Sequence, residues 1–421
     1  MGPILLCDKS AVQGLSGAEL NMLRRNYSLM IPPVLLMEIL ADLRKADDIE
    51  TGQTEVQRLA NKLVPACSYV NVGFREIVIG ELHGYKMPSD GRPVLRKGKS
   101  VTSGGQTGMI LEQSPEDEAL LRWQRGSFLD AEKLLATEWR RISQAIDLEG
   151  VQRVLRDHYS RHTKLKSFAE VATLVGELLQ SAPPRKLVSW FLTDSEILAD
   201  KFEEPLSKIE RNSTFKLDAE LPYTSRCLRV ALIFHFGLAF GLVSARSTNR
   251  IDLEYLYYLP FCMVFSSGDF LHRDLVQFIS KDQIFIPRDV FKADLKGLAM
   301  WWTSLTAKEQ EEERHRIGPP EFEVSVTHQA WKKFMKPGYR ERTPLKQKMS
   351  PEGEEKMMDH IREMMKGVVP ASPPDLSIDD CDFVVHKRNV RVDGPCICGS
   401  DRMFKDCCGR EIVAELERQR L

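Results

Sequence analysis

In the first 45 residues, short continuous apolar runs alternate with segments in which apolar residues recur at helical spacing. Ile4 to Cys7 is a short apolar run whose length suits a buried parallel strand, and Asp8 follows it directly. Helical spacing returns at Ala18 to Arg25, and Leu29 to Ile31 suits a second strand. Pro32-Pro33 then opens a helix that is expected to run to about Arg44. The chain is therefore predicted to begin as strand, helix, strand, helix.

The pattern changes in the middle of the chain. Between Tyr85 and Pro115, Gly, Ser, Lys and Arg are frequent and apolar periodicity is weak, which predicts a long mobile loop. From Glu116 to about Glu203, apolar residues recur at helical spacing, which predicts a helical insertion. A long helix is then expected over Ser225 to Arg246.

Short elements typical of an α/β core return near residue 250. A turn at Ser247 to Arg250, a helical piece from Asp252 to Leu259 and a strand from Cys262 to Phe265 are expected. Ser266-Ser267-Gly268-Asp269 follows, so a second carboxylate comes after a second strand. Ile284 to Ile286 is predicted to be a further strand.

The length of 421 residues allows two or three domains, because single hydrophobic cores stop growing at about 250 to 300 residues. We predict an α/β domain over residues 1–300, with a parallel sheet, interrupted at about 85–222 by the helical insertion. A helical and basic connecting region is expected over residues 301–380, including a charged helix over 307–316 and a linker over 368–374. A small C-terminal module is expected over residues 381–421.

Composition and charge narrow the function classes. The net charge of -1 gives no general attraction to nucleic acid, so a polyanion site must be a local patch. The most apolar stretch, Val230 to Ala245, is shorter than the roughly 20 residues that cross a bilayer, so we expect a core helix and no membrane partner. Met1 to Cys7 lacks the features of a secretory signal, and a cytoplasmic location is therefore expected.

A local basic patch lies between Thr327 and Lys348, where basic and aromatic residues are interspersed. Trp331, Phe334 and Tyr339 would offer stacking faces to bases, while the cations follow the phosphates. A merely solvated surface is the other interpretation. The candidate nucleic-acid contacts are Lys332, Lys333, Arg340 and Arg342.

Four of the nine cysteines gather near the C-terminus, within 13 residues. In a reducing compartment such clustering indicates a metal site, and four thiolates suit tetrahedral zinc. Reduced surface cysteines without metal are the alternative. These residues closely resemble the SEC-C motif, which implies a zinc-binding docking or stabilising module. The expected ligands are Cys396, Cys398, Cys407 and Cys408.

Acidic residues at the predicted strand ends suggest a second metal site. Because the carboxyl ends of parallel strands converge on one crevice, Asp8 and Asp269 could meet there although they are far apart in sequence. Glu38 lies in an apolar helix face, where an unpaired charge is costly to bury. With Asp252, these carboxylates could hold Mg²⁺ or Mn²⁺, which activate water for phosphodiester hydrolysis.

Three segments give this pattern a resemblance to the PIN-domain superfamily of metal-dependent nucleases: residues 4–10, 31–38 and 252–269. The resemblance implies a PIN-like core that cleaves RNA, with DNA less favoured, and places Ser10 near the metal. Compact PIN domains are shorter, so the segment from about Tyr85 to Pro222 would be an insertion. Asp274 could replace either late aspartate. The implied catalytic ligands are Asp8, Glu38, Asp252 and Asp269.

Each acid also has a structural interpretation. Asp8 and Asp252 could cap helices, Asp269 could end a turn, and Glu38 could pair with a core arginine. The corresponding functional alternative is a catalytically inactive PIN-like scaffold that binds RNA, ribosome or protein through the SEC-C module. A phosphatase would need a second aspartate two residues after Asp8, where Ser10 stands. His272, close to Asp269 in sequence, is a candidate for orienting substrate.

Overall fold

The computed structural model of the chain describes residues 2–44, 49–63, 68–96, 99–103, 106–110, 114–159, 165–280, 282–315, 318–335, 402–403 and 406. Its contacts divide the chain into two units, Met1–Ser304 with Pro319–Phe334, and Leu305–Gly318 with Met335–Leu421. Helix α17 (Ala307–His315) belongs to the second unit, and all other elements named below belong to the first.

A parallel five-stranded sheet forms the centre of the first unit, in the order β3-β2-β1-β6-β7. Leu5, Leu6 and Cys7 of the central strand have 0% exposure. Strands covered by helices on both faces are apolar throughout, so their sequences are short continuous runs. The predicted α/β class with a parallel sheet is confirmed. The strands are β1 (Ile4–Cys7), β2 (Ser28–Ile31), β3 (Ser68–Val70), β6 (Val264–Ser267) and β7 (Ile284–Pro287).

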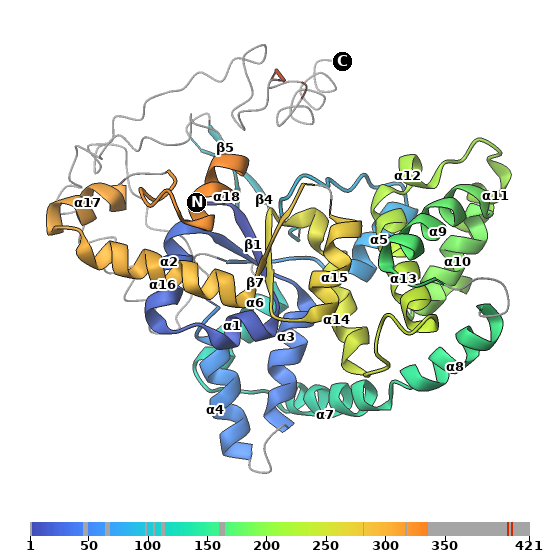
Figure 1. Cartoon of the computed structure of the whole chain (residues 1–421), viewed down its shortest axis with the longest axis horizontal. Helices are drawn as coiled ribbons and strands as arrows, with labels where there is room; N and C mark the ends of the chain where they lie inside the picture. The colour runs from blue at the N-terminus through green and yellow to red at the C-terminus, as the bar shows by residue number, and fades with distance from the viewer. Residues whose placement is uncertain are drawn as a thin grey trace. The chain divides into compact units, whose positions relative to one another are not determined.

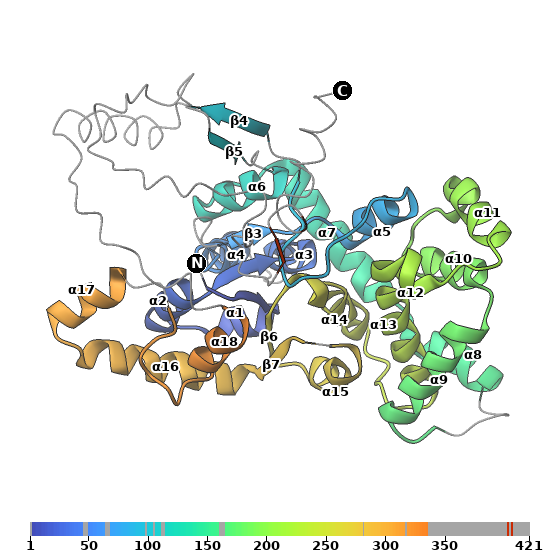
Figure 2. The same ribbon diagram turned by 90° about the horizontal axis from the view of Figure 1, so that it is seen from above.

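Helices cover both faces of this sheet (Figures 1 and 2). One face carries α2 (Gly17–Asn26), α16 (Arg288–Ser304) and α18 (Val326–Phe334), and the other carries α14 (Thr248–Tyr257) and α15 (Phe270–Ile279). Helix α18 is fastened to the end of α2, because the Trp331 indole donates a 2.8 Å hydrogen bond to the Asn26 carbonyl. Trp331 is 2% exposed, so its predicted role as a stacking face for bases is wrong.

The remaining helices of the core lie near the strand ends. The Pro32-Pro33 pair opens a helix as predicted, but the α-helix ends at Leu40 and a 3₁₀ turn continues to Arg44. These elements are α1 (Lys9–Gly14), α3 (Pro33–Leu40), η1 (Ala41–Arg44), α4 (Ile49–Ala60), α5 (Phe74–Leu82) and η4 (Leu259–Phe261).

Between β3 and β6 the chain forms a large, mainly helical region. Its central helix is α13, most of whose residues are buried, and it packs against α8, α9, α10 and α14. The helical pattern predicted from Glu116 to Glu203 is confirmed. The helices are α6 (Pro115–Gln124), α7 (Asp130–Ala145), α8 (Leu148–Tyr159), α9 (Phe168–Ser181), α10 (Pro184–Asp194), η3 (Ala199–Phe202), α11 (Glu203–Arg211), α12 (Leu217–Glu220) and α13 (Pro222–Ala239).

The prediction of a long loop from Tyr85 to Pro115 is wrong in part. It contains an antiparallel hairpin of β4 (Lys99–Ser103) and β5 (Gln106–Ile110). A two-stranded ribbon is joined by backbone hydrogen bonds, so its side chains need not show apolar alternation. The better signal was the Gly104-Gly105 pair between the strands, since Gly-Gly is typical of tight hairpin turns.

Three predicted boundaries near the second carboxylate also need correction. Helix α13 ends at Ala239 rather than Arg246, because Gly241 takes a left-handed conformation with φ of 77° and Leu242 N–H bonds back to the Gly237 carbonyl. Helix α14 begins at Thr248, so Asp252 lies within it and does not cap it. Strand β6 extends to Ser267, so both serines of the motif are part of the strand.

Among the described residues, no helix combines the length and the apolar character needed to span a bilayer. The most apolar predicted stretch belongs largely to α13, which is a buried helix of the insertion.

Candidate active site

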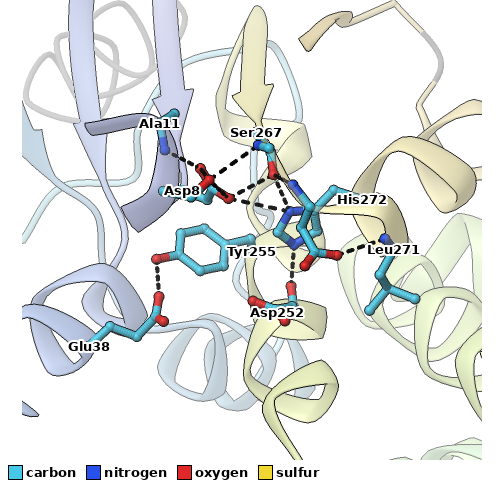
Figure 3. A network of polar contacts seen from close by, with 11 residues as sticks. Asp8, Ala11, Glu38, Asp252, Tyr255, Ser267, Leu271 and His272 are labelled. Atoms are coloured by element: carbon cyan, nitrogen blue, oxygen red, sulfur yellow. Dashed lines mark hydrogen bonds and ion pairs between the residues drawn. The ribbon is translucent and has the colours of Figure 1, made fainter. Parts of the chain in front are cut away.

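The sequence-predicted acids gather at the point where the strand order of the sheet reverses. From β1 the sheet continues to β2 and β3 on one side, and to β6 and β7 on the other. In open α/β sheets, a crevice opens at the carboxyl ends of the two strands beside such a switch point. Asp8 follows β1 and Asp269 follows β6, while Glu38 of α3 and Asp252 of α14 face the same region (Figure 3).

Asp8 is 5% exposed and held by several donors. The backbone N–H of Ala11 donates to Oδ1 at 2.8 Å, which makes Asp8 the N-cap of α1, as its structural interpretation predicted. The Ser10 and Ser267 hydroxyls lie 2.9 Å and 2.7 Å from Oδ2. Asp8 therefore has one fixed orientation, supported by the start of α1 and by the neighbouring strand β6.

Ser267 links Asp8 to a buried histidine. Its Oγ accepts the Asp269 backbone N–H at 2.9 Å and lies 2.7 Å from Nδ1 of His272. The other ring nitrogen, Nε2, lies 2.7 Å from the backbone carbonyl oxygen of Asp252 and donates to it. His272 has 0% exposure, so any influence on a substrate, for which the sequence made it a candidate, would have to act through its neighbours. His272 connects β6, α14 and α15.

We expect Ser267→Ala to lower the free energy of unfolding by about 1 to 3 kcal/mol, because buried partners of a lost hydroxyl stay unsatisfied. Asp8 and His272 would both lose a bond. Urea denaturation would measure this loss. Ser304→Ala is the control, since the Ser304 hydroxyl is exposed and bonds only within α16. A Ser267→Ala loss no larger than the control's would contradict the role of this hydroxyl.

Glu38 is half-buried at the end of α3 nearer to the site, and its partner is a tyrosine rather than the core arginine considered from sequence. The Tyr255 hydroxyl donates to Oε2 of Glu38. The pKa of Glu38 is raised to about 7, mainly by burial and also by the negative charges of Asp8 and Asp42, while the Tyr255 hydrogen bond and the Lys9 charge oppose the rise. Glu38 is therefore partly protonated near neutral pH.

Lys9 and Asp42 were not anticipated from sequence. Nζ of Lys9 lies 2.7 Å from Oδ2 of Asp42, which is buried, and donates to the Glu38 carbonyl at 2.9 Å. The ion pair ties the start of α1 to η1, the hydrogen bond ties it to α3, and together they place one positive charge near the acids. The only sequence signal was the position of Lys9 directly after Asp8.

Asp252 has a more strongly raised pKa than Glu38. Burial, followed by the negative charges of Asp269, Glu38 and Asp8, raises its pKa to about 8, and the positive charge of Arg246 opposes the rise. Among the described residues, no hydrogen bond or ion pair to its carboxylate is found. The mutual influence of the four acids means that they share one electrostatic environment.

Asp269 caps α15, since one of its carboxylate oxygens accepts the Leu271 N–H at 2.7 Å. Asp274, the sequence-based alternative for a late ligand, is on the same helix, and its Oδ1 lies 3.3 Å from Nε of Arg273. Asp274 is not among the charges that act on Asp252. The geometry thus favours Asp269 over Asp274 as the late member of the cluster.

The oxygen ligands of these residues are of the type that a hard divalent cation prefers, but their side chains are too far apart to hold one ion as they stand. Carboxylate oxygens are the preferred ligands of Mg²⁺ and Mn²⁺, and a cation would relieve the repulsion at Asp252. Within the described part of the chain, however, no three His, Cys, Asp or Glu side chains are grouped closely enough to hold one ion. Binding would require side-chain movement, above all of Glu38 away from Tyr255.

Other candidates have plainer roles. His235 lies 2.8 Å from Oδ1 of Asp194, so its ring has a polar partner. Cys7, Cys227 and Cys262 are buried core residues, and Cys67 lies outside the described residues.

The predicted nucleic-acid patch is only partly described. Lys332 is exposed near the end of α18, and Lys333 donates to the Asp282 carbonyl at 2.7 Å while its ammonium lies over the Phe334 ring. Arg340, Arg342 and Tyr339 lie outside the described residues. The structure thus leaves the patch as a prediction.

The four C-terminal cysteines also lie outside the described residues. Comparison with known proteins bears on this segment. No curated protein and no solved structure matches the chain. The family model of the SEC-C motif matches residues 395–410, a range that includes Cys396, Cys398, Cys407 and Cys408, so the chain carries a SEC-C motif near its C-terminus.

Proposed function

We propose that this protein is a metal-dependent nuclease with a PIN-like core, which hydrolyses phosphodiester bonds in RNA in preference to DNA. Its catalytic ligands would be the acids at the switch point of the sheet. Their order along the chain, after a first strand, in a following helix, and around a late strand, agrees with the resemblance to PIN domains. These residues are Asp8, Glu38, Asp252 and Asp269.

The observation that carries this proposal is the buried carboxyl group of Asp252, for which no hydrogen-bond or ion-pair partner is found among the described residues. Its pKa is raised to about 8 by burial and by three neighbouring acids. Protein interiors avoid such uncompensated groups unless a partner binds there, and perturbed carboxylates at a sheet crevice are typical of functional sites. A divalent cation is the simplest partner for this set of oxygens.

The chain's own residues prepare this chemistry. Ser10, Ala11 and Ser267 fix the Asp8 carboxylate before any ligand arrives. The Tyr255 hydroxyl bonds to Glu38, and this hydrogen bond must break before Glu38 can bind a metal ion. Bound Mg²⁺ or Mn²⁺ would neutralise charge on the phosphate and lower the pKa of a water. Hydrolysis would leave a 5′-phosphate and a free 3′-hydroxyl.

The C-terminal SEC-C motif has a separate role in this proposal. Its four cysteines would bind one zinc ion as a closed tetrahedral site, which leaves no position for a reactive water. The motif would therefore dock the enzyme on a protein or ribosomal partner, or stabilise its C-terminus, without taking part in hydrolysis.

One observation favours a second candidate, a catalytically inactive PIN-like scaffold that binds RNA, ribosome or protein. In the described residues no three potential ligands are grouped around one ion position, and Glu38 is engaged by Tyr255. An inactive scaffold would keep these contacts permanently and would bind its partner equally well without divalent cations.

A cleavage assay separates the two candidates. The full chain would be incubated with single-stranded RNA, structured RNA and DNA, with Mg²⁺, with Mn²⁺, or with a chelator that leaves the zinc in place. We expect cleavage of RNA that requires Mg²⁺ or Mn²⁺ and yields 5′-phosphate ends. Binding without cleavage under every condition would support the scaffold instead.

A further inference from the structure

A large aromatic side chain stands exposed beside the acid cluster. Phe270 directly follows Asp269, and its side chain is 68% exposed. Single exposed apolar residues are common on protein surfaces and need no special explanation by themselves. The surroundings of Phe270 are what give it significance.

Two arginines flank the segment from Gly268 to Phe270. The Arg273 guanidinium lies over the Phe270 ring, 4.6 Å from its centroid. The Arg288 guanidinium lies against Gly268, where a Cβ would be 3.2 Å from Cζ of Arg288 and 2.9 Å from the Ser10 hydroxyl. Since the Ser10 hydroxyl bonds to Asp8, Arg288 lies near a residue that holds one of the acids.

Both guanidinium groups can reach a ligand. Arg273 is 55% exposed and Arg288 is 40% exposed. Among the described residues, the ion pair found for each is with the carboxylate of the following residue, Asp274 or Asp289. Exposed ion pairs of this kind are weak, so a phosphate can replace them at little cost. The acids therefore have an aromatic ring and two cations on one rim.

We propose that Phe270, Arg273 and Arg288 form a platform for a single-stranded polynucleotide, in which a base stacks on Phe270 and the arginines contact the adjoining phosphates. A π-face with neighbouring cations is the arrangement that binds single strands without reading their sequence. RNA as the ligand rests on the proposed function. The platform would lead the strand to the acids, since only Asp269 and Gly268 lie between Phe270 and the end of β6.

Binding is tested with the full chain in buffer without added Mg²⁺ or Mn²⁺, with the zinc content measured on each preparation, so that no strand is cut. Fluorescence anisotropy would follow a labelled 12-nucleotide RNA, the same sequence as DNA, and the RNA as a duplex. We expect Phe270→Ala to weaken single-strand binding about tenfold, for RNA and DNA alike, because one stacked base is lost. Phe270→Trp should restore it. Duplex binding should not change, since its base faces are already stacked.

Tyr85→Ala is the matched control, because Tyr85 is an aromatic of the same 68% exposure on another surface segment. Thermal melting would show that each variant is folded. Equal single-strand affinity of Phe270→Ala and Tyr85→Ala would overturn the platform, even if the wild-type chain cleaves RNA. A tenfold loss at Phe270 in a chain that cleaves nothing would uphold the platform and remove the nuclease proposal.

Discussion

Asp8→Asn is expected to reduce metal-dependent cleavage of RNA about a hundredfold or more. Metal-ion catalysis contributes several kcal/mol of transition-state stabilisation, and each 1.36 kcal/mol is tenfold in rate. An amide is a poor ligand in place of the most fixed carboxylate of the cluster. It keeps the shape of the side chain, and the hydroxyls of Ser10 and Ser267 can turn to accept its N–H groups. Single-turnover cleavage rates with Mn²⁺ would measure the change.

Asp130→Asn is the control for this experiment, because Asp130 lies on α7 with 98% of its side chain exposed. It should cleave at the wild-type rate. Zinc content and melting temperature, measured on the same preparations, should be alike in all three proteins. If Asp8→Asn cleaves as fast as wild type, the acids at the switch point do not hold the catalytic ion.

The second large effect concerns stability and pH. In the absence of divalent cations, the free energy of unfolding is expected to fall as pH rises from about 4 to about 8. Folding raises the pKa of Asp252 from 3.8 to about 8 and that of Glu38 from 4.5 to about 7. The folded chain therefore binds more protons than the unfolded chain in this window, and raising the pH removes that advantage. Above about pH 8 the contribution levels off.

Asp252→Asn should remove most of this slope, because an amide does not ionise. At pH 8 in EDTA we expect the variant to be more stable than wild type by about 2 to 4 kcal/mol, and at pH 4 to be similar to it. Mn²⁺ should stabilise the wild type and reverse the order. Denaturation curves at several pH values would measure this, with Asp130→Asn as the control. Parallel pH profiles of wild type and Asp252→Asn would contradict the strained state of this carboxylate.

The parts of the fold that could be predicted are those whose signal is local. Ile4–Cys7 and Ser28–Ile31 are buried on both faces, so their sequences are continuous apolar runs that identify strands without tertiary information. The proline pair marks the start of α3 because its fixed backbone angle suits a first helical turn. From these elements, the rule for strand ends brought Asp8 and Asp269 to the same crevice.

The parts that could not be predicted depend on long-range contacts. Ser267 is an unremarkable strand residue until β6 pairs with β1 and brings its hydroxyl to Asp8. His272 was a candidate for orienting substrate only because it is close to Asp269 in sequence, and nothing local indicated that packing between β6 and α14 would bury it. The partner of Glu38, Tyr255 rather than an arginine, could not be predicted for the same reason, since nothing local indicates which distant residue faces α3.

The pairing of β1 with β6 has a consequence for the order of folding. Leu6 is paired with Phe265, so the central strands meet only after the intervening chain has been made and ordered. Closing so long a loop is slow and entropically unfavourable, whereas the helices between them form through nearby contacts. A nascent polypeptide that ends just before β6 carries Asp8, Glu38 and Asp252 but lacks Asp269 and Ser267, whose hydroxyl holds Asp8. The complete cluster therefore exists only after β6 and the start of α15 have been made, and a product truncated before β6 would carry three of its four acids.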